Sequence, residues 1–302
     1  MTLTYETVDV FTETPFGGNP LAVVFGGEHL TTERMQAIAV EFAYSETTFV
    51  LPPKDPANTA QVRIFTPTRE VPFAGHPNVG TATVVARRGT LFGRPVADAV
   101  RFEEGAGLVP ISILSEGGTP VGAQLTVPQP FQRGTEVPAA DIAACLGLSE
   151  SAIRIDRHPP IGGTVGLEFI LVELADRAAL EAARPIRAEF ESRLATRPVY
   201  DIHCYLRTGD EDEVDVRTRM FAPLDDIDED PATGSANGAL LGLLAELDGP
   251  ADGMMALRIA QGVEMGRPSL LLGEVDRAGG ATIAIRVGGR CVAMMRGELV
   301  MP

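Results

Sequence analysis

Glu46 and His76 are the residues of this chain whose types and surroundings best suit acid/base chemistry. Glu46 lies in AYSETTFV, where a helix is expected to end and an apolar strand to begin. A carboxyl group at such a join can be half-buried, which raises its pKa from about 4.3 toward 6–7 and suits general acid/base catalysis near neutral pH. The alternative interpretation is an ordinary helix-end or surface carboxylate.

His76 is the histidine that falls inside a motif suited to binding a ligand. It occurs in FAGHPNVG, a Pro/Gly-rich loop between an expected strand and an expected helix. His29 and His158 fall in polar or proline-rich loops, and His203 falls within a strand. We therefore expect these three to lie outside a site.

A second helix start resembles the one around His76. In DEDPATGSANGALLGLL (228–244), acidic residues lead into a proline, small residues and an apolar helix. A helix N-terminus carries unpaired N–H groups and partial positive charge, and glycines let a ligand approach the backbone. The two helix starts, with Gly75, Asp230, Gly234 and Ser235, could hold a carboxylated small molecule through backbone amides. The alternative is two capped helices with small residues for close packing.

These two helix starts belong to a longer internal repeat. RIFTPTREVPFAGHPNVGTA (63–82) and RMFAPLDDIDEDPATGSANGAL (219–240) share one plan, namely a strand ending Phe-x-Pro, an acidic turn and a loop opening a helix. The matched positions, at offsets of 156 and then 158, are Phe65 with Phe221, Pro67 with Pro223, Ala74 with Ala232, and Gly80 with Gly238. ETTFVLP (46–52) and GLEFILVEL (166–174) form a second pair. Two pairs in the same order favour a duplicated domain over chance similarity.

The expected elements alternate irregularly between strands and helices. Helices are predicted over 31–43 and 77–89, and helical pieces interrupted by Pro185 over 176–195. The predicted strands cover 5–12, 21–25, 46–52, 60–67, 99–103, 108–114, 121–127, 165–174, 201–208, 214–223, 281–289 and 291–300. The proline-containing stretch 121–134 is the best candidate for a domain crossing.

Composition excludes several classes of protein. The chain has 302 residues, 45% of them hydrophobic, and a net charge of −16 without a Lys/Arg block, so a nucleic-acid partner is not expected. The sequence lacks a membrane-length apolar run and a signal peptide, which predicts a cytoplasmic protein with no membrane partner. Cys145, Cys204 and Cys291 are widely spaced and are expected to be buried thiols, not a disulfide framework or a zinc site.

Four motifs together resemble the PhzF-like family. FGGNPLAVVF, SETTFV, FTPTREVPFAGHPNVGTA and DEDPATGSANGAL occur between residues 16 and 240 in the family's order and spacing. The family comprises phenazine-biosynthesis isomerases with the diaminopimelate epimerase fold. The resemblance implies an α/β (α+β) protein of two topologically similar domains, each a curved, mostly antiparallel sheet around a central helix, with the active site in the cleft. The expected domains are 1–120 plus 286–302, and 121–285.

The resemblance also implies which groups react. Related epimerases and racemases use two thiols, one per domain, but the matching positions here are Ala74 and Ala232. The PhzF-like branch uses a single Glu as acid and base, and Glu46 matches it. His76 and Asp230 match the other catalytic positions and would orient the substrate or relay the proton.

The substrate-binding positions implied by the family are Asn19, Gly75, Gly234 and Ser235. The implied enzyme is a cofactor-independent isomerase that needs no metal. It is expected to shift a proton on a small carboxylated metabolite, which in the founding member is cyclic, and to form a homodimer.

Two other functions remain open at this level. One is an epimerase or racemase with a different second base, although no second Cys or Glu was found opposite Glu46. The other is a non-catalytic protein that binds a carboxylated metabolite. A Rossmann oxidoreductase is disfavoured because no GxGxxG follows a strand, and a zinc hydrolase because ligands are lacking.

Overall fold

The computed structural model describes residues 2–209 and 213–300, and the chain separates into two compact units. The first unit comprises Met1–Thr126 with Gly288–Pro302, and the second comprises Val127–Val287. The division expected after residues 120 and 285 lies within a few residues of these boundaries. The two units are described one at a time.

The first unit combines a large sheet with two helices. Its elements are β1 (Thr2–Val10), β2 (Asn19–Phe25), α1 (Thr32–Phe42), β3 (Glu46–Leu51), β4 (Ala60–Phe65), β5 (Glu70–Val71), α2 (Gly75–Arg88), β6 (Thr90–Leu91), β7 (Arg94–Pro95), β8 (Ala99–Glu104), β9 (Gly107–Glu116), β10 (Thr119–Thr126) and the C-terminal part of β19 (Ala281–Val300).

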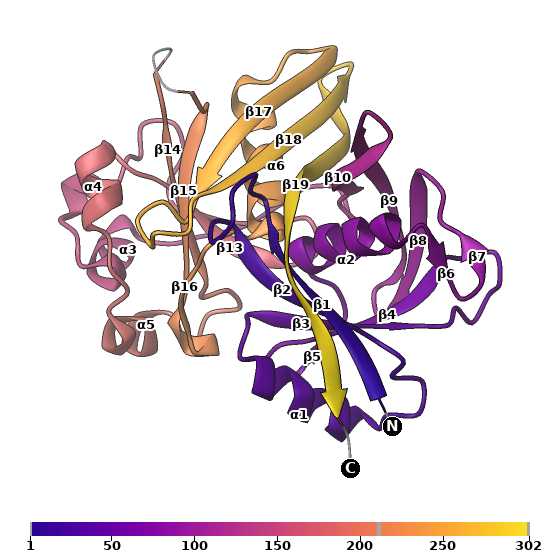
Figure 1. The fold of residues 1–302 in the computed structure, drawn as a ribbon. Helices are drawn as coiled ribbons and strands as arrows, with labels where there is room; N and C mark the ends of the chain where they lie inside the picture. The colour runs from indigo at the N-terminus through magenta and orange to yellow at the C-terminus, as the bar shows by residue number, and fades with distance from the viewer. Residues whose placement is uncertain (1, 210–212, 301–302) are drawn as a thin grey trace. The chain divides into compact units, whose positions relative to one another are not determined.

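The strands of the first unit pair in a ring around α2 (Figure 1). The pairs run from β1 through β2, β3, β4, β8, β9 and β10 to β19, which pairs with β1 again. Within this ring β2–β3 and β4–β8 are parallel and the other printed registers are antiparallel. Residues 75–85 of α2 are all buried, so α2 is the central helix that the sequence predicted for this domain.

The strands β2 and β3 are buried on both faces, which is why each contains a run of consecutive apolar residues. One face packs on α2, and the other packs on α1, whose Met35 and Ile38 join Val24 and Phe49 in one cluster. Gly80 lets α2 lie close to the sheet, because a Cβ there would be 2.6 Å from Leu21 Cδ2.

The second unit has a similar set of elements plus extra helices. Its elements are β11 (Gln132–Glu136), α3 (Ala139–Leu146), η1 (Glu150–Ala152), β12 (Ile161–Thr164), β13 (Glu168–Glu173), α4 (Arg177–Ala182), α5 (Arg187–Arg193), β14 (Ile202–Arg207), β15 (Val216–Ala222), η2 (Pro223–Asp225), β16 (Ile227–Asp230), α6 (Gly234–Asp248), β17 (Gly253–Gln261), β18 (Ser269–Ala278) and the start of β19.

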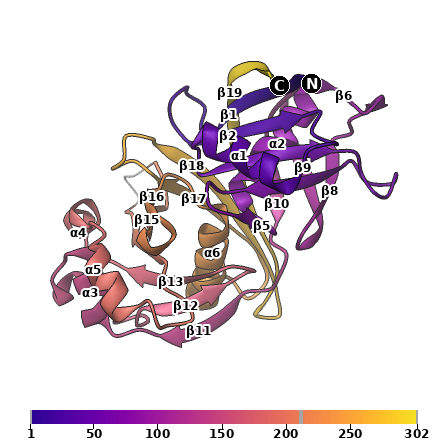
Figure 2. The ribbon, with the colours of Figure 1, turned by 90° about the horizontal axis from the view of Figure 1, so that it is seen from below.

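In the second unit α6 is the buried helix. Residues 234–245 are buried, and α6 packs on β12, β13 and β18. The helices α3, α4 and α5 lie together beside the same unit's sheet (Figure 2), with Leu146, Leu180 and Phe190 in one apolar cluster. The fold class is thus as expected, a mixed α+β fold built twice around a central helix.

Strand pairing confirms the duplication but changes one of its matches. β3 is parallel to β2 and antiparallel to β4, and β14 has the same relations to β13 and β15. The counterpart of ETTFVLP in β3 is therefore β14, and GLEFILVEL in β13 matches β2. The pairing by apolar content was wrong because both strands are buried on both faces and look alike in sequence.

The helix starts shift a second match by one residue. α2 begins at Gly75 after the N-cap Ala74, and α6 begins at Gly234 after the N-cap Thr233. The residue matching Ala74 is therefore Thr233 and not Ala232, at an offset of 159. Neither position carries a thiol, so this part of the inference is unchanged.

Further differences concern the second half of the chain. The strands predicted at 281–289 and 291–300 are one strand, β19. The helix α3 and the strands β11, β12, β16, β17 and β18 were not predicted. Within the described ranges, no helix is both long and apolar enough to span a membrane.

Candidate active site

Three predicted residues of the first unit meet at the start of α2. His76, in the first turn of α2, has its Nε2 atom 3.5 Å from Oε2 of Glu46, the first residue of β3. On the other side of the ring, His76 Nδ1 lies 3.3 Å from Nδ2 of Asn19, the first residue of β2. Because β2 and β3 are parallel neighbours, both strands begin at the same edge, next to the helix start. Gly75 precedes His76 as the first residue of α2.

The contacts of Asn19 favour one tautomer of His76. Ser45 Oγ donates to Asn19 Oδ1 at 3.5 Å, so the Asn19 amide turns its Nδ2 toward the ring. Since Nδ2 can only donate, His76 Nδ1 accepts and its proton lies on Nε2, on the side of Glu46. The imidazole is 4% exposed, and burial lowers its pKa to about 3. At neutral pH His76 is therefore an uncharged N–H donor.

Glu46 has the half-buried position that its sequence context predicted. Its side chain is 17% exposed, between the buried strand that follows it and the end of α1. Its Oε2 atom faces Nε2 of the neutral imidazole at 3.5 Å, a contact without the geometry of an ordinary hydrogen bond. This arrangement can accept a proton from a substrate carbon and return it, which is the chemistry of a general acid/base.

In the second unit, Asp230 lies at the end of β16, three residues before the N-cap of α6. Its carboxyl is buried and accepts a hydrogen bond from the hydroxyl of Thr233, the N-cap residue of α6. Gln261 of β17 supports the same segment, because its Nε2 donates to the Asp230 carbonyl at 2.8 Å. Side-chain hydrogen bonds from Thr233 and Gln261 thus fix Asp230 in the segment that leads into α6.

Gly234 and Ser235 form the first turn of α6, as predicted. The hydroxyl of the N-cap residue Thr233 donates to Asp230. Among the residues that the structure describes, this side chain accepts no hydrogen bond from the α6 backbone. The N-cap of α2, Ala74, likewise makes no side-chain hydrogen bond to its helix. The first amides of both helices are therefore not capped by those side chains, which leaves them suited to an anion.

Two residues near the helix starts were missed from sequence. His203 was expected to be incidental, but its Nε2 contacts Asn237 Oδ1 of α6 at 3.2 Å, and burial lowers its pKa to about 4. Asp201 is the register counterpart of Glu46, because Thr47 pairs with Phe65 as Ile202 pairs with Phe221, and Glu46 and Asp201 each come one residue earlier. Only the strand register exposes this match.

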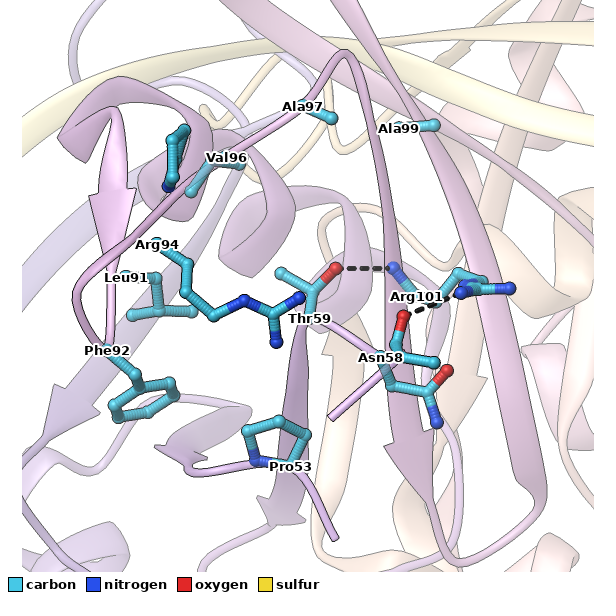
Figure 3. A pocket seen from close by; sticks show the side chains of 12 residues that line it. Pro53, Asn58, Thr59, Leu91, Phe92, Arg94, Val96, Ala97, Ala99 and Arg101 are labelled. Carbon is cyan, nitrogen blue, oxygen red and sulfur yellow. Dashed lines mark hydrogen bonds between the residues drawn. The ribbon is translucent and has the colours of Figure 1, made fainter. Parts of the chain in front are cut away.

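The cysteines are buried thiols, and the pocket drawn in Figure 3 contains none of the site residues named above. All three thiols are buried, and burial raises their pKa values to about 11 or 12. Within residues 2–209 and 213–300 no three His, Cys, Asp or Glu side chains gather in a potential metal site. The pocket in Figure 3 lies in the first unit and contains Arg94 and Arg101. Their guanidinium groups donate to the carbonyls of Pro56 and Ala57, which braces a loop.

The profile of the phenazine biosynthesis-like protein family, PhzC-PhzF, matches residues 8–297. This chain belongs to that family. An uncharacterised isomerase of Mesorhizobium japonicum is 38% identical to it over 306 residues, covering 99% of each chain. The trans-2,3-dihydro-3-hydroxyanthranilate isomerase of Pseudomonas aeruginosa is 36% identical over 296 residues, covering 97% of this PhzF-like chain and 98% of the relative.

A solved structure agrees with this assignment. The PhzF-family protein of Bacillus anthracis superposes with a TM-score of 0.88 at 25% identity, over the full length of both chains. The PhzF-like chain is an enzyme of the isomerase class, as predicted.

Proposed function

We propose that this PhzF-like enzyme is a cofactor-independent isomerase in which Glu46 is the single acid and base. The Glu46 carboxylate removes a proton from a carbon next to an unsaturated, carboxylated system. The electron pair of that C–H bond moves through the conjugated system, and the protonated Glu46 returns the proton to another carbon. The product is an isomer, so the step needs no oxidant or added reactant.

The contact between Glu46 and His76 carries this proposal. A neutral imidazole with its proton on Nε2 can donate a hydrogen bond to the carboxylate or to a developing negative charge on the substrate. Its pKa of about 3 disfavours an imidazolium intermediate at neutral pH, so the proton stays with Glu46. We assign His76 to orientation, with Asn19 holding its ring.

The substrate carboxylate is assigned to backbone amides at a helix start. The candidates are Gly75 at the start of α2 in the first unit, and Gly234 and Ser235 at the start of α6 in the second. Asp230 is assigned to orienting a polar group of the substrate. The name of the Pseudomonas aeruginosa relative supports a carboxylated cyclic substrate, since that protein is a trans-2,3-dihydro-3-hydroxyanthranilate isomerase. We take that compound as the first substrate to test.

The test is proton exchange in D₂O with the variant Glu46→Gln. The wild-type enzyme should form product carrying deuterium, and the variant should lose about 10²–10⁴-fold in rate, the usual contribution of a general acid/base. Glu41→Gln, an exposed carboxylate at the end of α1, is the matched control and should keep the wild-type rate. Exchange by Glu46→Gln at the wild-type rate would remove Glu46 from the mechanism. Binding without exchange by the wild type would favour a non-catalytic binding protein.

Asp201 gives a specific reason to test epimerisation as the second candidate. A carboxylate in the register position of Glu46 could act as the second base of an epimerase. In that case a chiral substrate would exchange its proton with inversion, and Asp201→Asn would block exchange from one enantiomer only. A double-bond shift without inversion decides for the single-base isomerase.

A further inference from the structure

Glu104, the last residue of β8, carries a buried carboxyl group outside the cluster described above. Neither of its oxygens makes a hydrogen bond of ordinary geometry with the described part of the chain. The side-chain amide of Asn78, in α2, lies beside the carboxyl and lowers its pKa, but burial has the larger effect and raises it to about 8. Around neutral pH Glu104 is therefore mostly a neutral acid.

Contacts around Glu104 lead directly to the start of α2. Asn78 Nδ2 donates to the carbonyl of Ala74, the N-cap of α2, at 3.1 Å. The turn after Glu104 touches the segment that enters the helix, because Ala106 N donates to Pro72 O at 3.0 Å. A Cβ at Gly105 would come within 2.9 Å of Pro72 Cα, so the two segments are in close contact.

The second unit repeats this arrangement with a neutral residue. β4 pairs in parallel with β8 through Ala60↔Phe102, and β15 pairs in parallel with β17 through Val216↔Ile259. Two residues further along, Glu104 therefore matches Gln261. Each is near an asparagine in the fourth position of the central helix, Asn78 in α2 and Asn237 in α6.

In the second unit the contact is an ordinary hydrogen bond. Asn237 Nδ2 donates to Gln261 Oε1 at 2.7 Å and to the carbonyl of the N-cap Thr233 at 3.0 Å. Gln261 Oε1 also accepts from Thr233 N at 3.2 Å. A neutral side chain at this position thus fixes an asparagine, and the asparagine fixes the helix start.

We propose that Glu104 is a positioning residue that, as a neutral acid, keeps Asn78 on the Ala74 carbonyl and so sets the turn carrying Gly75 and His76. Ionised Glu104 would be a buried charge beside the Asn78 amide. The Asn78 Nδ2 group has two hydrogens and can serve two acceptors, as Asn237 does, but a carboxylate attracts it more strongly than a neutral acid and so draws it off the Ala74 carbonyl, which disturbs the helix start.

The charged side chains around Glu104 do not neutralise its carboxyl group. Lys54, Arg63 and Glu70 line the same hollow. Arg63 is paired with Glu70 through two hydrogen bonds of 2.7 and 2.6 Å. Among the described residues none forms an ion pair with Glu104, and the neighbouring strand β9 places Gly107 opposite it.

The test is an NMR titration of the His76 ring between pH 6 and 10 in the full-length protein. The pKa of His76 is about 3, so its own titration lies outside this range. In the wild type the His76 Cε1–H resonance should shift with a midpoint near pH 8. In Glu104→Gln, which carries the residue type of Gln261, this shift should disappear, whereas it should remain in Glu41→Gln and in Glu46→Gln, which removes the other carboxyl group, 3.5 Å from the His76 ring. A flat wild-type titration, or an unchanged one in Glu104→Gln, overturns the proposal.

An activity measurement adds the catalytic consequence, which rests on the proposed function. Wild-type kcat/KM should be about tenfold lower at pH 9 than at pH 7, following the neutral fraction of a group with a pKa of about 8. Glu104→Gln should lose this alkaline decrease, and an unchanged decrease would overturn the link to catalysis. Because the NMR signal needs no substrate, a wild type without turnover but with the His76 shift would refute the proposed function and keep the positioning role.

Discussion

Two buried imidazoles should make the folded protein sensitive to acid. Burial lowers the pKa of His203 to about 4 and that of His76 to about 3, from an ordinary value near 6.5. Between pH 6.5 and these values the unfolded chain binds protons that the folded chain does not. The contribution of these two imidazoles to stability is therefore fully present above pH 6.5 and is lost as the pH falls. Glu104, whose pKa is raised to about 8, has the opposite pH dependence, so the comparison below is made between variants that share it.

The size of the effect follows from the same values. With 1.36 kcal/mol per pKa unit, His203 alone should lower the free energy of unfolding by about 2 kcal/mol from pH 7 to pH 5, and by about 3 kcal/mol to pH 4. Against a total stability of about 5–15 kcal/mol, such a loss is easily measured.

Urea unfolding at several pH values, followed by far-UV circular dichroism, measures this loss. His203→Gln keeps an N–H that can reach Asn237 but does not titrate, so its stability should fall about 2 kcal/mol less than that of the wild type between pH 7 and pH 5. Its absolute stability is expected to be lower, and the slope with pH is the readout. His29→Gln, at an exposed position, is the control and should keep the wild-type slope. Parallel curves for His203→Gln and the wild type would refute the reasoning from burial.

Two packing predictions follow from single contacts. Gly242→Ala should destabilise the protein by about 1–3 kcal/mol in urea unfolding, because its Cβ would lie 2.4 Å from Phe131 Cγ. Gly209→Ala, with open space around the added Cβ, should cost under about 0.5 kcal/mol in the same experiment. Arg219→Met should cost about 3–5 kcal/mol, since it leaves the Glu229 carboxylate without the guanidinium that donates to it at 2.7 and 2.8 Å. The double variant with Glu229→Leu should recover part of that loss, and a double variant less stable than Arg219→Met would contradict the argument.

Local signals in the sequence predicted much of the fold. The helix predicted over 31–43 is α1, whose N-cap Thr31 accepts from Arg34 N, and Pro185 separates α4 from α5 as expected. The break predicted at residue 290 was wrong, because β19 runs unbroken from Ala281 to Val300. Gly288, close to that position, lies against β10, where a Cβ would be 2.7 Å from the Ala123 carbonyl oxygen. A glycine near a strand end and a glycine needed for close packing look alike in sequence.

Site residues could be predicted from sequence only where a reactive residue type stands at a recognisable boundary between two elements. Glu46 and His76 stood out because each follows a recognisable change of element. The Asn19–His76 contact joins residues 57 positions apart. Glu104 has the residue type of an ordinary surface carboxylate. Its burial and its match to Gln261 come from strand register, which depends on the pairing of distant strands.

The duplicated fold retains its backbone while its reactive side chains differ, and this difference favours the single-base reaction. The helix starts match as Ala74 with Thr233 and as His76 with Ser235, so neither start carries a thiol and one carries an imidazole. Both units have a carboxylate at the matching strand position, Glu46 in the first and Asp201 in the second. The imidazole of His76 contacts Glu46, whereas the matching residue of the second unit is Ser235. Two equivalent bases would need similar partners. A proton shift in which one group removes and returns the proton needs only one such partner, and His76 supplies it for Glu46.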